Sequence, residues 1–142
     1  MVACACQREV GIDVEYHRQI EEPLELAEKV FSRQEFLLLE SIPPAERSAA
    51  FLALWVCKES YVKGTGEGLS HPPNRYAIRH IDGTPRLVCD TIHPNRVKLW
   101  ALHQLAAPTG YVAALATAGD CRVSALSMLN GNELSDAIRS AR

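Results

Sequence analysis

The strongest constraint on the fold is a long helix that the sequence predicts from about Ala45 to Lys63. Pro43-Pro44 breaks the preceding element and favours a helix start, because proline is tolerated in the first turn of a helix but not in its interior. Glycines at positions 64, 66 and 68 follow, and glycine commonly ends a helix in the left-handed conformation. Because the stretch from Ala49 to Cys57 is apolar on every side, we expect the first part of this helix to be buried.

Shorter elements are predicted before the long helix. Pro23 stands at a plausible helix start, with apolar residues following at helical spacing. Ser32 and Glu35 have the capping-box spacing that begins a second short helix. Further upstream, the segments from Val2 to Cys6 and from Val10 to Val14 predict two short strands or one interrupted strand.

Beyond Ser70 the pattern becomes that of an antiparallel sheet. Strands are predicted for Tyr76 to Ile81, Arg86 to Asp90, Val97 to Leu105 and Tyr111 to Thr117, the first two joined as a hairpin at Asp82-Gly-Thr-Pro85. Trp100 and Tyr111 are expected in the core. Helices followed by strands predict the α+β class, an antiparallel sheet packed against two or three helices.

Composition limits the number of domains and the surroundings of the chain. The 142 residues, of which 47% are hydrophobic, are enough for one core, which we place at 1–128, and the tail at 129–142 is expected to be a loosely held helix or a frayed end. A formal net charge of −2 argues against nucleic acid as a partner. No apolar window is long enough to cross a bilayer and the N-terminus lacks a signal-peptide layout, so we predict a cytoplasmic protein without a membrane partner.

Cysteine and histidine spacing gives no metal motif. The cysteines are scattered, which predicts free thiols in a reducing compartment: Cys4, Cys6, Cys57, Cys89 and Cys121. The histidines of the second half form no cluster in sequence and are expected at the surface or in ordinary hydrogen bonds: His71, His80, His93 and His103.

Acidic residues give a different signal. Asp13 and Glu15 are two residues apart, so on a strand both carboxylates project from the same face. Glu59 shares a helical stripe with Trp55 near the end of the long helix, which implies partial desolvation. Three such carboxylates suit the oxygen coordination of Mg²⁺, and Mn²⁺ accepts the same ligands. The alternatives are an exposed edge strand and a solvated helix pair between Glu59 and Lys63.

Several blocks together resemble the 4′-phosphopantetheinyl transferase superfamily, most closely its Sfp type. The signature-like blocks are Gly11-Ile-Asp-Val-Glu15, Trp55-Val-Cys-Lys-Glu-Ser-Tyr-Val-Lys63 and Gly64-Thr-Gly-Glu-Gly-Leu-Ser70, and the segments Ala27 to Glu35 and Tyr111 to Ala116 also match. The resemblance covers roughly residues 2 to 128. It implies the second half of a pseudo-two-fold enzyme, without the first half that contributes much of the coenzyme A pocket. The chain is therefore expected either to be a fragment or to form a homo-oligomer, as the holo-synthase branch does.

This resemblance implies an enzyme that moves the 4′-phosphopantetheine arm of coenzyme A to a serine of an acyl or peptidyl carrier protein and releases 3′,5′-ADP. Asp13, Glu15 and Glu59 would hold Mg²⁺, with Asp13 and Lys63 on the coenzyme A side. Glu59 would accept the serine proton and Lys63 would stabilise the leaving group. Lys58 is expected to face away, holding structure or a partner surface. The alternative is a catalytically silent domain that binds carrier protein or coenzyme A, or a fragment that needs an N-terminal half.

Carrier proteins of this kind are usually acidic, which implies a basic docking surface beside the site. The sequence offers Arg33, Arg75 and Arg79 as candidates and does not place the surface further.

Overall fold

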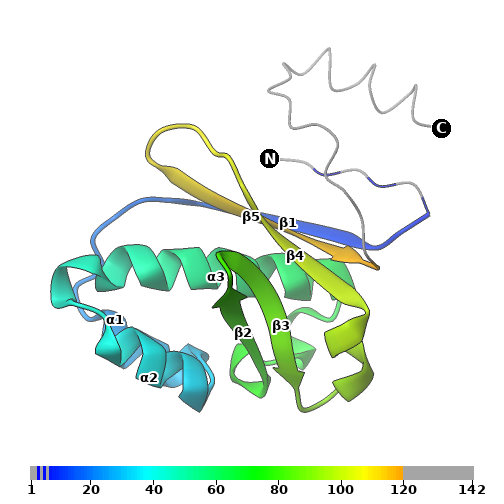
Figure 1. Cartoon of the computed structure of the whole chain (residues 1–142), viewed down its shortest axis with the longest axis horizontal. Coiled ribbons are helices and arrows are strands. Elements are labelled where there is room, and N and C mark those ends of the chain that lie inside the picture. The colour runs from blue at the N-terminus through cyan, green and yellow to red at the C-terminus, as the bar shows by residue number, and fades with distance from the viewer. Residues whose placement is uncertain (1–2, 4, 6, 120–142) are drawn as a thin grey trace.

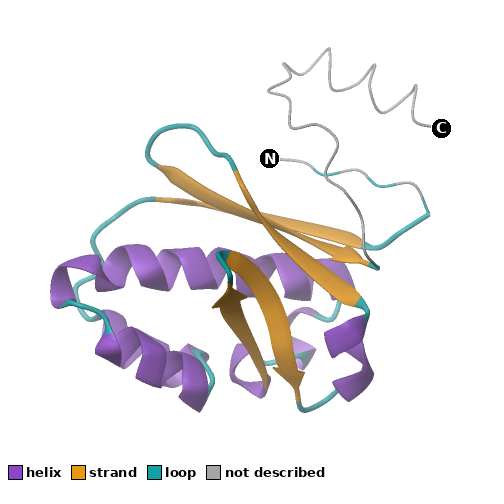
Figure 2. Ribbon diagram, in the orientation of Figure 1, coloured by secondary structure: helices purple, strands orange, loops and turns teal. Residues whose placement is uncertain are grey.

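One long helix, α3 (Arg47–Thr65), organises the fold (Figure 1). The computed structural model describes residues 3, 5 and 7–119. In the orientation of Figure 1, the sheet of β1, β5 and β4 lies above α3, while α1, α2 and the hairpin of β2 and β3 lie below it. Figure 2 shows the same separation of sheet and helices, and the α+β class is confirmed.

The remaining elements follow in chain order. The helices and strands are β1 (Val10–Tyr16), α1 (Pro23–Val30), α2 (Arg33–Ser41), β2 (Tyr76–Ile81), β3 (Thr84–Asp90), β4 (Trp100–Leu105) and β5 (Tyr111–Ala118). Short 3-10 helices are η1 (Pro44–Glu46), η2 (Gly68–Ser70), η3 (Pro73–Arg75) and η4 (Pro94–Lys98). Between Val10 and Ala118 the predicted elements are thus present, with boundaries shifted by a few residues.

Both sheets are antiparallel. β5 is the middle strand of the order β1-β5-β4. Its residue Ala114 is the register partner of Asp13 in β1. The hairpin of β2 and β3 turns at Asp82 and Gly83, whose φ values of 52° and 76° are left-handed. Asp-Gly is a favoured pair for such a turn, because its twist matches the flanking strands.

The helix ends follow the local chemistry of the sequence. α1 begins at Pro23, and α2 has the predicted capping box, in which the Ser32 backbone N–H donates to Glu35 at 2.8 Å. α3 is preceded by η1, so it begins at Arg47 rather than at Ala45. It ends on Gly66, whose φ of 70° is the left-handed conformation of a C-terminal cap.

The prediction that the first part of α3 is buried holds only in part. Phe51, Leu52, Val56 and Cys57 are buried, whereas Ala49 is exposed and Leu54 and Trp55 are only half-buried. In the more polar C-terminal part, Lys58 and Tyr61 are fully buried as well. The polar side chains of the C-terminal part can be buried because they have partners: Tyr61, for example, donates to Asp90 at 2.7 Å. α3 packs chiefly against β1 and β5.

Two further expectations differ from the structure. Trp100 is buried as predicted, but Tyr111 is 47% exposed. Tyr111 faces Tyr16 in the last register pair of β1 and β5, and the two rings lie edge to face at 5.3 Å between centroids. Residues 97 and 98 belong to η4 rather than to a strand.

Some predictions fall partly or wholly outside the described residues. Positions 2, 4 and 6 of the first predicted strand and the tail at 129–142 are among them, and the described Ala3 and Ala5 are not in a strand. Cys57 and Cys89 are free thiols, and the other three cysteines lie outside the described residues. Within the described ranges, none of the helices has the length and apolar character needed to cross a membrane.

Candidate active site

A close backbone crossing brings β1 against the C-terminal half of α3. A Cβ added to Gly11 would lie 2.1 Å from the Ser60 carbonyl oxygen and 2.2 Å from the Gly64 nitrogen. A Cβ on Gly64 would in turn lie 2.6 Å from the Trp100 ring. Only glycine fits at these two positions, because any side chain would separate the strand from the helix. The crossing places the face of β1 that carries Asp13 next to α3.

Asp13 and Lys63 form the central contact of the site. The Lys63 ammonium donates to Asp13 Oδ1 at 2.5 Å, from the last turn of α3 to the middle of β1. Asp13 is 7% exposed, and its other oxygen, Oδ2, is buried without a hydrogen-bond partner among the described residues. A buried carboxylate oxygen of this kind retains its capacity to accept a donor or a cation.

Glu59 faces the same acidic residues one turn earlier on α3. Burial raises the pKa of Glu59 above its usual value, Asp13 and Glu15 raise it further, and Lys63 opposes the shift. The structure thus brings Asp13, Glu15, Glu59 and Lys63 within electrostatic range of one another. A carboxylate with a raised pKa beside a cation is suited to accept a proton during a reaction.

The three predicted metal ligands present only oxygen donors, which is the chemistry a hard divalent cation requires. The buried, unpartnered Oδ2 of Asp13 fits that role. Glu15 is paired with Arg18 at 3.0 Å and Asp13 with Lys63. In the described part of the chain, no group of three or more His, Cys, Asp or Glu side chains is arranged as a ligand set. The metal site therefore stays a prediction, and it requires Glu15 to leave Arg18.

Lys58 does face away from the site, into a buried ion pair that the sequence did not reveal. Its ammonium donates to both Glu35 oxygens at 2.8 and 2.9 Å and to the Tyr76 carbonyl at 2.7 Å. Both charged side chains are fully buried. Glu35 also accepts from Ile78 N–H at 2.8 Å, so this carboxylate caps α2 and holds α3 and β2 as well. The capping-box spacing had identified only the first of these roles.

The expectation that the histidines lie at the surface or in ordinary hydrogen bonds is wrong for His71, whose ring is buried without a hydrogen-bond partner among the described residues. His71 and His93 approach the carboxylate of Glu67, each at 2.9 Å, and His71 also lies 3.3 Å from Asp90. His71 is 1% exposed. The fold assembles this cluster from segments that are distant in sequence. The four-residue spacing of Glu67 and His71 was the one sequence signal for any of these contacts.

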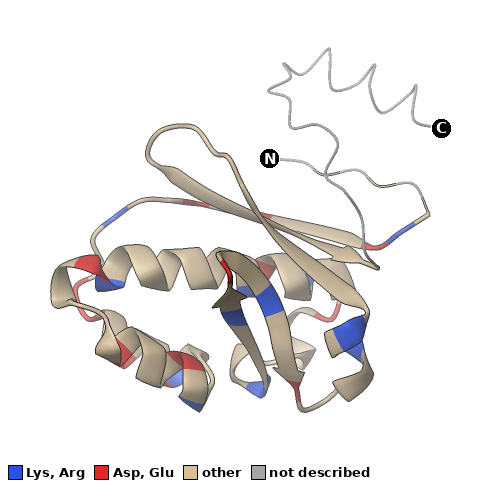
Figure 3. Cartoon of the chain, viewed as in Figure 1, with Lys and Arg blue, Asp and Glu red and all other residues tan. Residues whose placement is uncertain are grey.

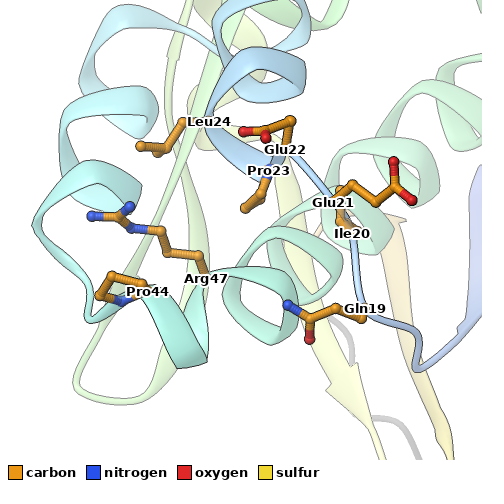
Figure 4. A pocket seen from close by; sticks show the side chains of 8 residues that line it. All are labelled: Gln19, Ile20, Glu21, Glu22, Pro23, Leu24, Pro44 and Arg47. Atoms are coloured by element: carbon orange, nitrogen blue, oxygen red, sulfur yellow. The ribbon is translucent and has the colours of Figure 1, made fainter.

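Two pockets among the described residues lie away from the acidic site. One of about 290 Å³ lies at the other end of α3, and its lining includes Leu24, Pro44, Arg47, Glu21 and Glu22 (Figure 4). Arg47 lies twelve residues before Glu59 on α3, about 18 Å at the rise of an α-helix.

Of the three candidate docking arginines, two share one pocket. Arg33 and Arg75 line a pocket of about 170 Å³ beside Tyr76, while Arg79 is exposed on β2. Figure 3 shows Lys and Arg spread over several elements, including the hairpin and the segment before β4, and interspersed with acidic residues.

Comparisons with known proteins identify the family of the chain. The family model described as the 4′-phosphopantetheinyl transferase superfamily matches residues 9–116. The 4′-phosphopantetheinyl transferase HetI of Nostoc sp. is 31% identical over 115 residues, which are 79% of this chain and 44% of HetI. The 4′-phosphopantetheinyl transferase Sfp of Bacillus subtilis is 38% identical over 84 residues, 58% of this chain and 37% of Sfp. The chain therefore spans less than half the length of these two relatives.

Solved structures share the fold. The holo-[acyl-carrier-protein] synthase of Thermotoga maritima aligns with a TM-score of 0.61 at 19% identity, over 90% of this chain and 73% of that one. The holo-(acyl-carrier-protein) synthase of Bacillus anthracis, solved in complex with CoA (3′,5′-ADP), aligns with a TM-score of 0.60 at 19% identity, over 78% of this chain and 94% of that one. The family model covers Asp13, Glu15, Glu59 and Lys63, the residues that meet where β1 crosses α3. The chain belongs to the 4′-phosphopantetheinyl transferase superfamily.

Proposed function

We propose that this chain provides the catalytic carboxylates and lysine of a 4′-phosphopantetheinyl transferase. The reaction moves the phosphopantetheine arm of coenzyme A to a serine of an apo acyl or peptidyl carrier protein. The observation that carries the proposal is the convergence of Asp13, Glu59 and Lys63, in which a buried acid is paired with a lysine beside a carboxylate of raised pKa. The names of HetI and Sfp, and the coenzyme A complex of the Bacillus anthracis synthase, support this substrate class.

Glu59 is the proposed proton acceptor. The serine hydroxyl attacks the β-phosphate of coenzyme A, a new P–O bond forms to the serine oxygen, and the P–O bond to 3′,5′-ADP breaks. The serine proton passes to Glu59. Because burial, Asp13 and Glu15 already raise the pKa of Glu59, protonation of this carboxylate relieves repulsion within the site.

Lys63 is the proposed contact for the diphosphate and for the leaving group. Its side chain is 50% exposed while that of Asp13 is 7% exposed, so the ammonium bridges the buried acid and the surface where a substrate would lie. As the bond to 3′,5′-ADP breaks, negative charge grows on the leaving phosphate, and a lysine held nearby stabilises that charge.

Asp13, Glu15 and Glu59 would hold Mg²⁺, or Mn²⁺, when a metal is bound. A bound divalent cation supplies charge neutralisation for the diphosphate. Asp13 offers its buried Oδ2 without giving up the Lys63 contact at Oδ1. Glu15 is free to turn inward once it leaves Arg18, an exposed pair that contributes little stability.

The half-length match affects how the chain would act. We propose that a second copy, or a separate half-domain, completes the coenzyme A pocket, since the chain spans 44% of HetI and 37% of Sfp. Native mass in solution distinguishes the two arrangements. A homo-oligomer supports completion by a second copy, and a monomer supports completion by a separate half-domain.

The test of the proposed function is the intact mass of an apo carrier protein incubated with this chain, coenzyme A and Mg²⁺. A mass gain of one phosphopantetheine that is lost with Glu59→Ala, and retained with the matched control Glu21→Ala, supports the transferase. Glu21 is exposed at the far end of α3. A gain only after addition of the first half of a relative would identify a chain that needs a partner half. No gain in either case would favour a silent domain that binds carrier protein or coenzyme A.

A further inference from the structure

A second charged cluster lies immediately beyond the C-terminal end of α3. Glu67 follows the capping Gly66, and its carboxylate accepts from both guanidinium nitrogens of Arg96, at 2.5 and 3.2 Å. His93 approaches the Oε1 atom of Glu67 and His71 its Oε2 atom, each at 2.9 Å. One carboxylate thus has three cationic or potentially cationic neighbours.

The cluster continues to Asp90 at the end of β3. Asp90 accepts the hydroxyl of Tyr61 at 2.7 Å through Oδ2, and the backbone N–H groups of Ile92 and His93 through Oδ1. The buried ring of His71 lies between Asp90 and Glu67, although neither contact meets hydrogen-bond geometry. The network therefore joins α3 to the β3–η4 connection from two sides.

Arg96 and His93 come from a different part of the chain than Glu67. His93 immediately precedes η4 and Arg96 lies within it, and η4 leads directly into Trp100 at the start of β4. The Trp100 ring packs against Gly64 of α3. In Figure 1, η4 lies beside the C-terminal end of α3, between β3 and β4. The end of α3 is thus fixed to η4 by Glu67 and to β4 by packing at Gly64.

The turn between these contacts is intrinsically loose. Gly66 and Gly68 have φ values of 70° and 53°, and no atom of the described residues would touch a Cβ on either of them. Glycine loses more conformational entropy on ordering than any other residue, so a turn of this composition needs contacts to hold it. Glu67 is the residue between the two glycines, and its carboxylate provides such contacts.

We propose that Glu67, held by contacts with Arg96 and His93, is a positioning residue for Lys63. Glu67 fixes the glycine turn at 66–68, which directly follows the last helical turn of α3, and that helical turn carries Lys63. The inference rests on the proposed role of Lys63 at the diphosphate of coenzyme A. Lys63 has a half-exposed side chain, so its reach depends on the placement of the backbone at the end of α3. The Gly66 N–H donates to the Val62 and Lys63 carbonyls, which links the turn directly to the lysine.

The test combines Glu67→Gln with Lys63→Ala in a double-mutant cycle, with binding of 3′,5′-ADP as the readout. Glu67→Gln keeps the size of the side chain and removes its charge. It should weaken binding by about tenfold, the ratio expected for the loss of one charge-assisted contact. In the Lys63→Ala background the same substitution should have no further effect, because Glu67 acts through Lys63. Glu21→Gln is the matched control and should leave binding unchanged.

Amide hydrogen exchange gives a second readout that does not depend on the ligand. Exchange at 64–70 should accelerate in Glu67→Gln and in Arg96→Lys, which cannot form the two-nitrogen contact, while the middle of α3 keeps its protection. If exchange is unchanged in both variants, the contact between Glu67 and Arg96 does not hold the turn. An equal loss of binding with and without Lys63 would overturn the positioning role. If the wild-type chain and its completed form fail to bind 3′,5′-ADP, the proposed function fails, and exchange alone decides whether Glu67 holds the turn.

Discussion

Replacing Gly11 by alanine tests whether the close crossing of β1 and α3 sets the geometry of the site. The added Cβ would lie 2.1 Å from the Ser60 oxygen and 2.2 Å from the Gly64 nitrogen. Ordinary contacts of a Cβ atom lie at 3.4–4 Å, and both neighbours here are backbone atoms that cannot rotate away. The strand and the helix would have to separate by about 1 Å or more.

The expected cost follows from this overlap. Overpacking a well-packed contact costs about 1–3 kcal/mol, and the rigid backbone on both sides places Gly11→Ala at the upper end of that range. For a domain of this size the melting temperature should fall on the order of 10 °C. Asp13 lies two residues further along β1, so it would move away from Lys63. A displacement of about 1 Å in a reacting group can reduce the rate about 100-fold.

Urea denaturation and the carrier-protein mass assay measure the two effects separately. Gly83→Ala is the matched control, since it has open space and a φ of 76°, and its cost is backbone strain alone, about 1–2 kcal/mol. The control should lose stability and keep transfer at a temperature where it is folded. If Gly11→Ala unfolds with the wild-type free energy, or loses stability but retains the full transfer rate, the crossing does not set the site.

Three further substitutions or modifications test the electrostatics of the interior. Lys58→Met should lower the free energy of unfolding by about 3–5 kcal/mol in urea denaturation, because Glu35 would remain as a buried charge; a loss below about 1 kcal/mol would contradict this. Glu59→Gln should raise the melting temperature of the metal-free protein at pH 7. The folded state raises the pKa of Glu59, so the wild-type protein loses stability as the pH rises above the usual value of 4.5. The gain should disappear at pH 4, and a gain that is independent of pH would refute this origin. Burial raises the pKa of the Cys57 thiol to about 12. Peptide mapping after iodoacetamide treatment should therefore find this thiol unmodified in the native protein and modified in denaturant. Modification in the native protein would count against its burial.

Much of the fold could be predicted because its signals are local. Pro23, the Ser32–Glu35 capping box, and the Asp82-Gly83 turn each act within a few residues, and the structure contains all three. The burial of α3 could not be predicted in the same way. An apolar run marks residues that tolerate burial, and Phe51, Leu52, Val56 and Cys57 of this run are buried. The run did not show that Lys58 and Tyr61 would be fully buried as well.

The candidate site shows the same division. The alternation of a strand predicted that Asp13 and Glu15 share a face, and the coupling of both to Glu59 is consistent with that. Spacing did not show that Asp13 would be paired with Lys63, 50 residues away in sequence. Long-range contacts of this kind also create the Glu67 cluster, whose members come from separate segments of the chain.

Some residues of α3 fix the position of the helix, while Glu59 between them keeps a partly exposed side chain. This explains how a rigid helix can carry a side chain whose protonation state changes. Lys58 is locked by Glu35 and by the Tyr76 carbonyl, which fixes the rotation of α3 about its axis. Gly64 is held against β1, which fixes the distance between strand and helix. Glu59 lies between these two fixed points, so its backbone is held while its side chain stays partly exposed. The proton transfer proposed for this carboxylate therefore need not disturb the packing that keeps it beside Asp13.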